Sequence, residues 1–307
     1  MEKEDFIKYL ESKDYAISTQ KDSVHQTKLF LNWVGKEDIQ ITKSDILDYL
    51  EYLKNQRNNA NPTRQTVLIA IRRYFDYLFE NEIIAKNPAG TLKMRGTQIK
   101  KLYHTYTNDD LDMLYDNFYS VYILGFEPNK YMGKDTIEYV KLKRGRNFAA
   151  LGILLYQGLH TNELKNIKLE DIDLNKAKIK IPSSEQAHAR TLPLKATQIG
   201  GLIQYIQQIR PKLVELYNDT DYLLEFEKQG IFDAVSHLKN MMKKIDRNFV
   251  NFRQIRASVI TNWLKTEGLR KAQYLAGHRT IQSTENYQPN NLENLIEDIA
   301  KHHPLNL

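Results

Sequence analysis

The sequence predicts a mainly α-helical protein, with an N-terminal four-helix bundle followed by a second, mainly helical domain that holds one small antiparallel β-sheet. Three observations support this prediction. Apolar residues recur at helical spacing along most of the chain, strict alternation is confined to 171–194, and 307 residues suffice for two domains. Because 41% of the residues are apolar, each domain can bury a core.

The first domain is expected to span residues 1–90. Within it, residues 4–80 carry apolar side chains at helical spacing and are long enough for four helices. In SDILDYLEYL, Ser44 is the expected N-cap ahead of the apolar stripe. The later helix TRQTVLIAIRRYFDYLFENE offers three cations for a polar face: Arg64, Arg72 and Arg73.

A basic linker is expected at residues 91–102. The stretch KNPAGTLKMRGTQIKKL, residues 86–102, holds five Lys/Arg and no acid, and its proline and glycines interrupt the helical pattern. Such a strap suits contact with a phosphate backbone, here through Lys93, Arg95, Lys100 and Lys101.

The second domain is expected at 103–290 and begins with a helix capped by Thr107 or Asn108. Residues 120–145 show no regular pattern, and the apolar helix RNFAALGILLYQGL ends at Gly158. DIDLNKAKIKIPSSEQAHARTLPL alternates on both sides of a polar turn, as a β-hairpin does. Further segments follow: helices at 195–217 and 230–245, a basic segment at 249–275, and an amphipathic docking helix within 291–307.

Composition and charge favour a polyanionic partner. The chain has no cysteine, which excludes disulfides, thiolate zinc sites and cysteine nucleophiles, and no apolar run long enough for a membrane span. A cytoplasmic protein is therefore expected. The net charge is +6, and residues 241–280 hold nine Lys/Arg against two acids. A solvated basic face and a phosphate-binding face are both open interpretations of this patch.

Four segments carry a resemblance to a known family. They are QGLHTNELKNIKLEDIDL, a hairpin ending in ARTLPL, NFRQIRASVITNWLKTEG, and LAGHRTIQSTENYQ. Their order and separation resemble the boxes of the tyrosine recombinase (phage integrase) family, and residues 4–80 resemble its core-binding domain. The resemblance implies site-specific cutting and rejoining of DNA in a helical catalytic domain.

The resemblance also implies roles for particular residues. Tyr287 matches the nucleophile, which forms a 3′-phosphotyrosyl bond with the DNA. His278 and Arg256 match groups that bind the scissile phosphate. No metal and no nucleotide cofactor are implied, because the ester retains the energy of the phosphodiester bond. The implied partners are double-stranded DNA and further copies of the chain in a tetramer, linked by exchanged C-terminal segments; docking of 291–302 onto its own domain is the alternative.

Three pocket positions depart from the family pattern. His160 stands where the first catalytic arginine is usual, Arg253 where the box has its first histidine, and Glu185 where the hairpin lysine is usual. Arg253 lies three residues before Arg256, so both can share one helix face and rebuild a guanidinium pair. Alternatively, Arg253 contacts only the DNA backbone. Lys178 and Lys180 lie in the preceding strand, and either could reach the site in place of the hairpin lysine.

Three functions are consistent with these residues. The first is a working recombinase or integrase whose hairpin residues Lys180 and Arg190 also contact DNA. The second is a DNA-binding accessory protein of the same fold with an impaired pocket. The third is an unrelated helical interaction protein, in which Tyr287 only packs in a core. Covalent attachment to DNA separates the first from the second, and salt-dependent DNA binding separates both from the third.

Overall fold

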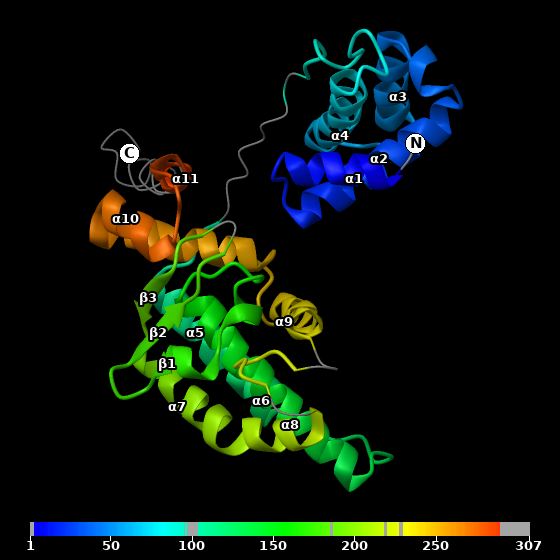
Figure 1. Cartoon of the computed structure of the whole chain (residues 1–307). Coiled ribbons are helices and arrows are strands. Elements are labelled where there is room, and N and C mark those ends of the chain that lie inside the picture. Colours follow the sequence, from blue (N-terminus) through cyan, green and yellow to red (C-terminus); the bar gives the residue numbers. More distant parts are fainter. Residues whose placement is uncertain are drawn as a thin grey trace, which may run out of the picture. The chain divides into compact units, whose positions relative to one another are not determined.

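The chain forms two compact units in a computed structural model (Figure 1). The first unit is Met1–Lys101 and the second is Leu102–Leu307. The structure describes residues 3–94, 96, 104–184, 187–217, 220–226 and 230–288. Most of the expected linker and all of the expected helix at 291–302 lie outside these ranges.

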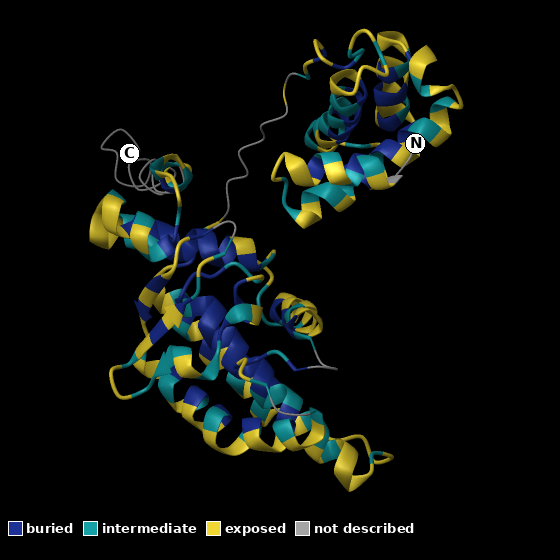
Figure 2. Ribbon diagram, in the orientation of Figure 1, coloured by how far each residue is buried: buried dark blue, intermediate teal, exposed yellow. Residues whose placement is uncertain are grey.

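The first unit is the predicted bundle of helices. It comprises α1 (Lys3–Ser12), α2 (Ile17–Val34), a short 3-10 turn η1 (Asp38–Gln40), α3 (Lys43–Asn55) and α4 (Asn61–Glu80). Its core is rich in aromatic residues, among them Phe6, Phe30, Tyr74 and Phe75, all of them buried. Figure 2 shows the buried residues on the faces that the helices turn toward one another.

The N-cap of α3 differs from the prediction. Thr42 occupies that position, because its backbone N–H donates to the Asp45 carboxylate at 2.8 Å and its hydroxyl accepts from the Asp45 N–H at 3.4 Å. This reciprocal arrangement satisfies two amides that the first turn would otherwise leave unpaired. Ser44 therefore lies inside the helix.

The second unit is mainly helical, and the predicted fold class is confirmed. Thr107 caps its first helix, as one of the two predicted choices. Its helices are α5 (Asn108–Phe118), the π-helical η2 (Tyr119–Leu124), α6 (Lys134–Tyr156), the 3-10 turns η3 (Leu164–Asn166) and η4 (Leu169–Asp171), α7 (Ala196–Gln204), the π-helical η5 (Tyr205–Ile209), α8 (Arg210–Tyr217), α9 (Ile231–Ile245), α10 (Phe252–Ala276) and α11 (Ile281–Glu285).

A three-stranded antiparallel sheet, in the order β1-β2-β3, contains the predicted hairpin. The strands are β1 (Ile172–Asp173), β2 (Lys178–Ile181) and β3 (Arg190–Pro193). In β2 the isoleucines face the core and the lysines face solvent, while Arg190 in β3 faces inward opposite Ile181. The alternation that predicted the hairpin thus also places one arginine inside.

Residues 120–145 are more regular than predicted. The π-helical η2 covers 119–124, and α6 begins already at Lys134. The first half of α6 is basic, and its residues are mostly exposed or half-buried, so it lacks the apolar periodicity by which a helix is recognised. Its second half, from Phe148 to Leu155, is buried throughout and forms the centre of the core, as Figure 2 shows.

Two buried helices position the candidate site. Residues 254–261 of α10 are buried on all sides, which fixes Arg256 inside the unit. After α6, Gly158 adopts φ +56°, and a Cβ there would lie 2.9 Å from Val259 of α10. The turn that carries His160 therefore packs directly against α10. Within the described ranges, no helix combines the length and the apolarity that crossing a bilayer would need.

Candidate active site

Tyr287 lies against His278. Their rings are nearly parallel, with an interplanar angle of 12° and centroids 5.7 Å apart. Gly277 ends α10 with φ +71°, α11 turns the chain back, and the Tyr287 N–H donates to the Thr284 carbonyl at 3.0 Å. The nine residues from His278 to Tyr287 therefore contain one short helix, α11, after which the chain brings the tyrosine back to the histidine.

His278 is held by bonds at both ring nitrogens. Its Nε2 lies 3.1 Å from an Arg256 Nη, and its Nδ1 lies 2.8 Å from the Thr284 hydroxyl. Arginine only donates, so Nε2 must accept, and the neutral ring carries its proton on Nδ1 and donates it to Thr284. Burial, followed by the nearby Arg256, lowers the pKa of His278 to about 4. His278 is therefore neutral at pH 7.

Arg256 is the buried cation at the centre of the site. It donates to the Gly158 carbonyl at 2.6 Å and to the Ala276 carbonyl at 3.0 Å, in addition to His278. Burial lowers its pKa, whereas charge interactions with Tyr287 and Glu163 oppose that effect. Its buried Nε has no partner among the described residues. Tyrosine, histidine and arginine thus converge, as the resemblance implied.

Glu163 is a site residue that the sequence did not single out. Its carboxylate is buried, lies 2.7 Å from an Arg190 Nη and 3.7 Å from an Arg256 Nη, and accepts the His160 N–H at 2.8 Å. Burial would raise the pKa of Glu163, but the two arginines outweigh it and lower that pKa. The only signal was one acid in the GLHTNEL box, and nothing in that box reveals its partner.

Arg190 lies inside the protein rather than on the expected DNA-facing surface. Its side chain is fully buried, because β3 turns this position inward. Besides Glu163 it bonds the Leu275 carbonyl at 2.9 Å, near the end of α10. It also packs on Gly277, where a Cβ would lie 2.5 Å from its Nη1. Arg190 therefore ties the hairpin to the turn that carries His278.

The hairpin connection is joined to the same turn through its backbone. The His188 N–H donates to the Gly277 carbonyl at 2.9 Å, and Ala187 forms an isolated antiparallel bridge with His278. Glu185, which takes the usual lysine position, lies outside the described residues. Lys178 and Lys180 are exposed on β2.

An open cavity of about 160 Å³ reaches Arg256 from the surface. Its lining includes His160 and Arg253, so the structure brings together two of the three residues that depart from the family pattern and the arginine that matches it. Arg253 is exposed, in the first turn of α10, where Asn251 caps the helix by accepting two backbone N–H groups. Burial, then Arg256, lowers the pKa of the half-buried His160. The other residues that line the cavity are Leu159, Thr161, Asn162 and Phe252.

This cavity is suited to an anion. Two guanidiniums face it from one helix, and the positive end of the dipole of α10 lies beside them. In the described residues no cluster of three or more histidine, aspartate or glutamate side chains is placed to hold a metal ion. The arrangement can bind a phosphoryl group at Arg253 and Arg256, and Arg256 also contacts His278, on which Tyr287 stacks.

The residues outside the pocket that were expected to contact DNA differ in exposure. Lys93 and Lys180 are exposed. Three arginines of the bundle are half-buried and bonded within it, since Arg64 donates to Leu50, Arg72 to Ala89 and Arg73 to Ser23. The free cationic face expected on α4 is thus partly used inside the bundle. The remaining predicted contacts, Arg95, Lys100 and Lys101, lie outside the described residues.

The helical fold and this combination of tyrosine, histidine and arginine define the tyrosine recombinase class. Family models match two parts of the chain: the N-terminal SAM-like domain of phage integrases at residues 3–85, and the phage integrase family itself at residues 135–293, which is just over half of the chain. The chain belongs to the phage integrase family.

Curated relatives align along most of the chain. The tyrosine recombinase XerC of Pelotomaculum thermopropionicum is 26% identical over 303 residues, which cover 94% of this chain and 91% of the relative. The tyrosine recombinase XerD of Vibrio vulnificus is 25% identical over 269 residues, which cover 86% of this chain and 81% of the relative.

Solved structures agree in fold. Lambda integrase (residues 75–356) bound to DNA aligns with a TM-score of 0.64 at 14% identity, over 94% of both chains. The XerH site-specific recombinase in a post-cleavage complex with a palindromic difH substrate aligns with a TM-score of 0.62 at 19% identity, over 90% of this chain and 79% of that one.

Proposed function

We propose that this chain is a site-specific DNA recombinase that cuts and rejoins duplex DNA through Tyr287. The observation that carries the proposal is the stacking of Tyr287 on His278, whose Nε2 lies 3.1 Å from an Nη of Arg256, a residue that lines the open cationic cavity. Its fold neighbours include recombinases solved with DNA, which supports double-stranded DNA as the partner.

The proposed reaction conserves the phosphodiester energy. The Tyr287 oxygen attacks the scissile phosphorus, the bond from phosphorus to the 5′ oxygen breaks, and that oxygen leaves as a hydroxyl after taking a proton. A 3′-phosphotyrosyl ester remains. Attack by the 5′ hydroxyl of another strand reverses these steps and joins that strand. Splitting the transfer in two makes each step an exchange of esters, so no external energy source is required.

Arg256 and Arg253 would bind the nonbridging oxygens of the phosphate. Guanidiniums match a phosphoryl group in geometry and remain charged, and they stabilise the charge that grows in the transition state. Both line the same cavity as His160. His160 alone is a weak clamp because burial lowers its pKa, but a bound phosphodiester anion, and still more the extra negative charge of the transition state, would draw a proton to it.

A proton donor for the leaving 5′ oxygen is proposed on the hairpin. Glu185 donates only when it is protonated, whereas Lys180 is exposed on β2 next to the connection that pairs with Gly277 and His278. Lys180 is therefore the proposed donor. Its ammonium has three N–H groups on a flexible stem, so a side chain from the neighbouring strand can replace the usual one.

DNA binding and assembly complete the proposal. We expect both units and the basic linker to contact the phosphate backbone, with Lys93 as one exposed contact. A lambda integrase structure of this fold is a tetramer on a Holliday junction, which supports a homo-tetramer on DNA here too. The protein would act in the cytoplasm, at its DNA target.

A specific observation also favours a second function. With His160 and Glu185 at positions that usually hold cations, the pocket lacks two of the groups usual in its family, and losing a well-placed transition-state donor costs about 10²–10³ in rate. The alternative is thus a DNA-binding accessory protein with an impaired pocket. Incubation with nicked suicide substrates, followed by denaturing gels, separates the two functions. A covalent adduct with the wild-type chain that Tyr287→Phe loses, while DNA binding persists, supports the recombinase; binding without any adduct supports the accessory protein.

A further inference from the structure

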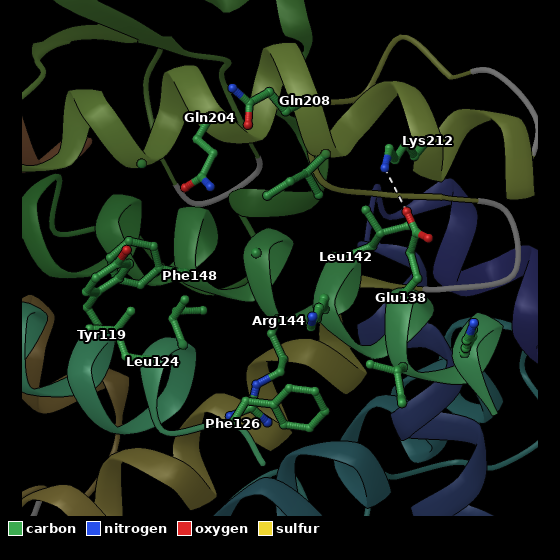
Figure 3. A pocket seen from close by; sticks show the side chains of 17 residues that line it. Tyr119, Leu124, Phe126, Glu138, Leu142, Arg144, Phe148, Gln204, Gln208 and Lys212 are labelled. Atoms are coloured by element: carbon green, nitrogen blue, oxygen red, sulfur yellow. Dashed lines mark hydrogen bonds and ion pairs between the residues drawn. The ribbon is translucent and has the colours of Figure 1, made fainter. Parts of the chain in front are cut away.

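A larger cavity, of about 810 Å³, lies on another part of the second unit, and none of the candidate active-site residues lines it. It is bordered by η2, by the first half of α6, and by α7, η5 and α8. Figure 3 shows Tyr119 and Leu124 on one wall and Gln204 and Gln208 on the helix opposite. We call this cavity the α6 groove.

The floor of the α6 groove is apolar and open to solvent. Tyr119, Ile123, Leu124, Phe126 and Phe148 contribute to it. Leu124 is 67% exposed. A contiguous exposed apolar surface bounded by charged residues is a common mark of a protein-binding site.

The rim of the α6 groove is positively charged. Four of its lining residues are cations, Lys134, Lys141, Arg144 and Lys212, against one carboxylate, Glu138. Glu138 is already paired with Lys212 at 2.7 Å, so the other three cations have no carboxylate in the groove.

Arg144 is held in one orientation. Its Nε donates to the Tyr122 carbonyl at 2.7 Å, and its guanidinium lies 3.9 Å from the centroid of the Tyr122 ring and 4.6 Å from that of Phe126. Figure 3 shows Arg144 beside Phe126. A cation held this way loses little side-chain entropy when it binds a ligand.

Both π-helical segments of the described residues, η2 and η5, contribute to this groove. Such segments are rare and frequently occur at functional sites. The wall between them is tightly packed, since a Cβ on Gly145 would lie 2.3 Å from Ile209. The groove is therefore built into the fold rather than left by one loose side chain.

We propose that the α6 groove binds a helix of another protein, one that presents apolar side chains beside carboxylates. The walls are helical and offer no open strand edge, so the fitting mode is a helix laid in a groove. Carboxylates would complement the three unmatched cations, which favours an acidic partner. Duplex DNA would use the cations but leave the apolar floor in water. The proposal does not depend on strand transfer by Tyr287.

The experiment uses the full chain and synthetic peptides. The probe is a fluorescent 15-residue helical peptide with leucines on one face and glutamates on the other. The controls are a version with scrambled leucine positions and a version with lysines in place of glutamates. Fluorescence anisotropy should give a micromolar Kd for the acidic peptide and at least about tenfold weaker binding for both controls. Equal binding of the scrambled or the basic peptide, or no binding of the acidic one, overturns the proposal.

Matched variants place the binding in the groove. Leu124→Asp and Lys141→Glu should each weaken peptide binding about tenfold. Phe232→Asp and Lys239→Glu, which are exposed on α9 outside the groove, should change it less than about twofold. Unchanged thermal unfolding of each variant shows that the fold is kept.

Three other occupants would overturn the proposal. One is duplex DNA, if it displaces the acidic peptide and Lys141→Glu weakens DNA binding. Another is a second copy of the chain, if sedimentation shows self-association that Leu124→Asp abolishes. The third is the chain's own C-terminus, if a peptide of residues 289–307 binds the groove more tightly than the acidic peptide.

Discussion

Glu163 and Arg190 form a buried ion pair, with Oε1 of the glutamate 2.7 Å from Nη1 of the arginine and side-chain exposures of 4% and 0%. The same carboxylate bonds the His160 N–H and lies near Arg256. One acid thus links the hairpin, the turn after α6 and α10. The cluster retains one more positive charge than negative, which suits a site for an anion.

Removing this carboxylate should strongly destabilise the second unit. Glu163→Gln leaves two buried guanidiniums without a counter-charge, and breaking a buried pair from one side costs about 3–5 kcal/mol. Urea denaturation measures the loss. Glu170→Gln is the control, because Glu170 is exposed and 3.9 Å from Lys168, and should cost less than about 0.5 kcal/mol. Similar losses for the two variants would show that the buried pair has no special role.

Stability should fall with acidification because His278 is held neutral. Its pKa is depressed from 6.5 to about 4 in the folded chain, so between these values the unfolded chain binds more protons. The free energy of unfolding is therefore highest, as far as His278 determines it, above about pH 6.5. It falls by about 1–3 kcal/mol as the pH falls toward 4, after allowing for the partial exposure of His278. His278→Gln should make the denaturation midpoint depend less on pH over this range. His188→Gln, at an exposed position, should leave that pH dependence unchanged. An unchanged pH slope in His278→Gln would contradict the assigned state of His278.

Arg253 should substitute for the arginine that is absent at position 160. Arg253→Ala should slow cleavage by about 10²–10³, close to the effect of Arg256→Ala, and His160→Ala should have a smaller effect. His160→Arg should preserve or raise the rate. Single-turnover cleavage of a suicide substrate is the measurement, and Arg270→Ala, exposed on α10 outside the pocket, is the control. If Arg253→Ala cleaves at the wild-type rate, Arg253 contacts only the DNA backbone and does not take part in the reaction.

Gly277 should not tolerate a side chain. Gly277→Ala would strain a residue at φ +71° and push a Cβ to 2.5 Å from the Arg190 guanidinium, so a loss of about 1–3 kcal/mol is expected. Gly200→Ala, in α7 with open space around it, should be neutral or stabilise by up to about 1 kcal/mol. Thermal denaturation distinguishes them, and a neutral Gly277→Ala would mean that Arg190 is free to move.

The sequence predicted the features that depend on local pattern. Helical periodicity predicted the mainly helical fold and alternation predicted the hairpin, while the family resemblance implied that Tyr287, His278 and Arg256 belong to one pocket. The basic start of α6 was missed because this segment, which is only partly buried, has no regular apolar stripe. The pairing of Glu163 with Arg190 joins residues 27 apart, and only the packed core decides it. For the same reason the buried position of Arg190 was not foreseen.

The most direct test of the account is to identify the residue that becomes joined to DNA. The wild-type chain is incubated with a suicide duplex and digested with protease and nuclease, and the modified peptide is sequenced by mass spectrometry. The proposed reaction predicts a nucleotide ester on Tyr287, joined through a 3′ phosphate, with a free 5′ hydroxyl on the released strand. A nucleotide on any other residue, or an adduct that persists in Tyr287→Phe, would contradict it.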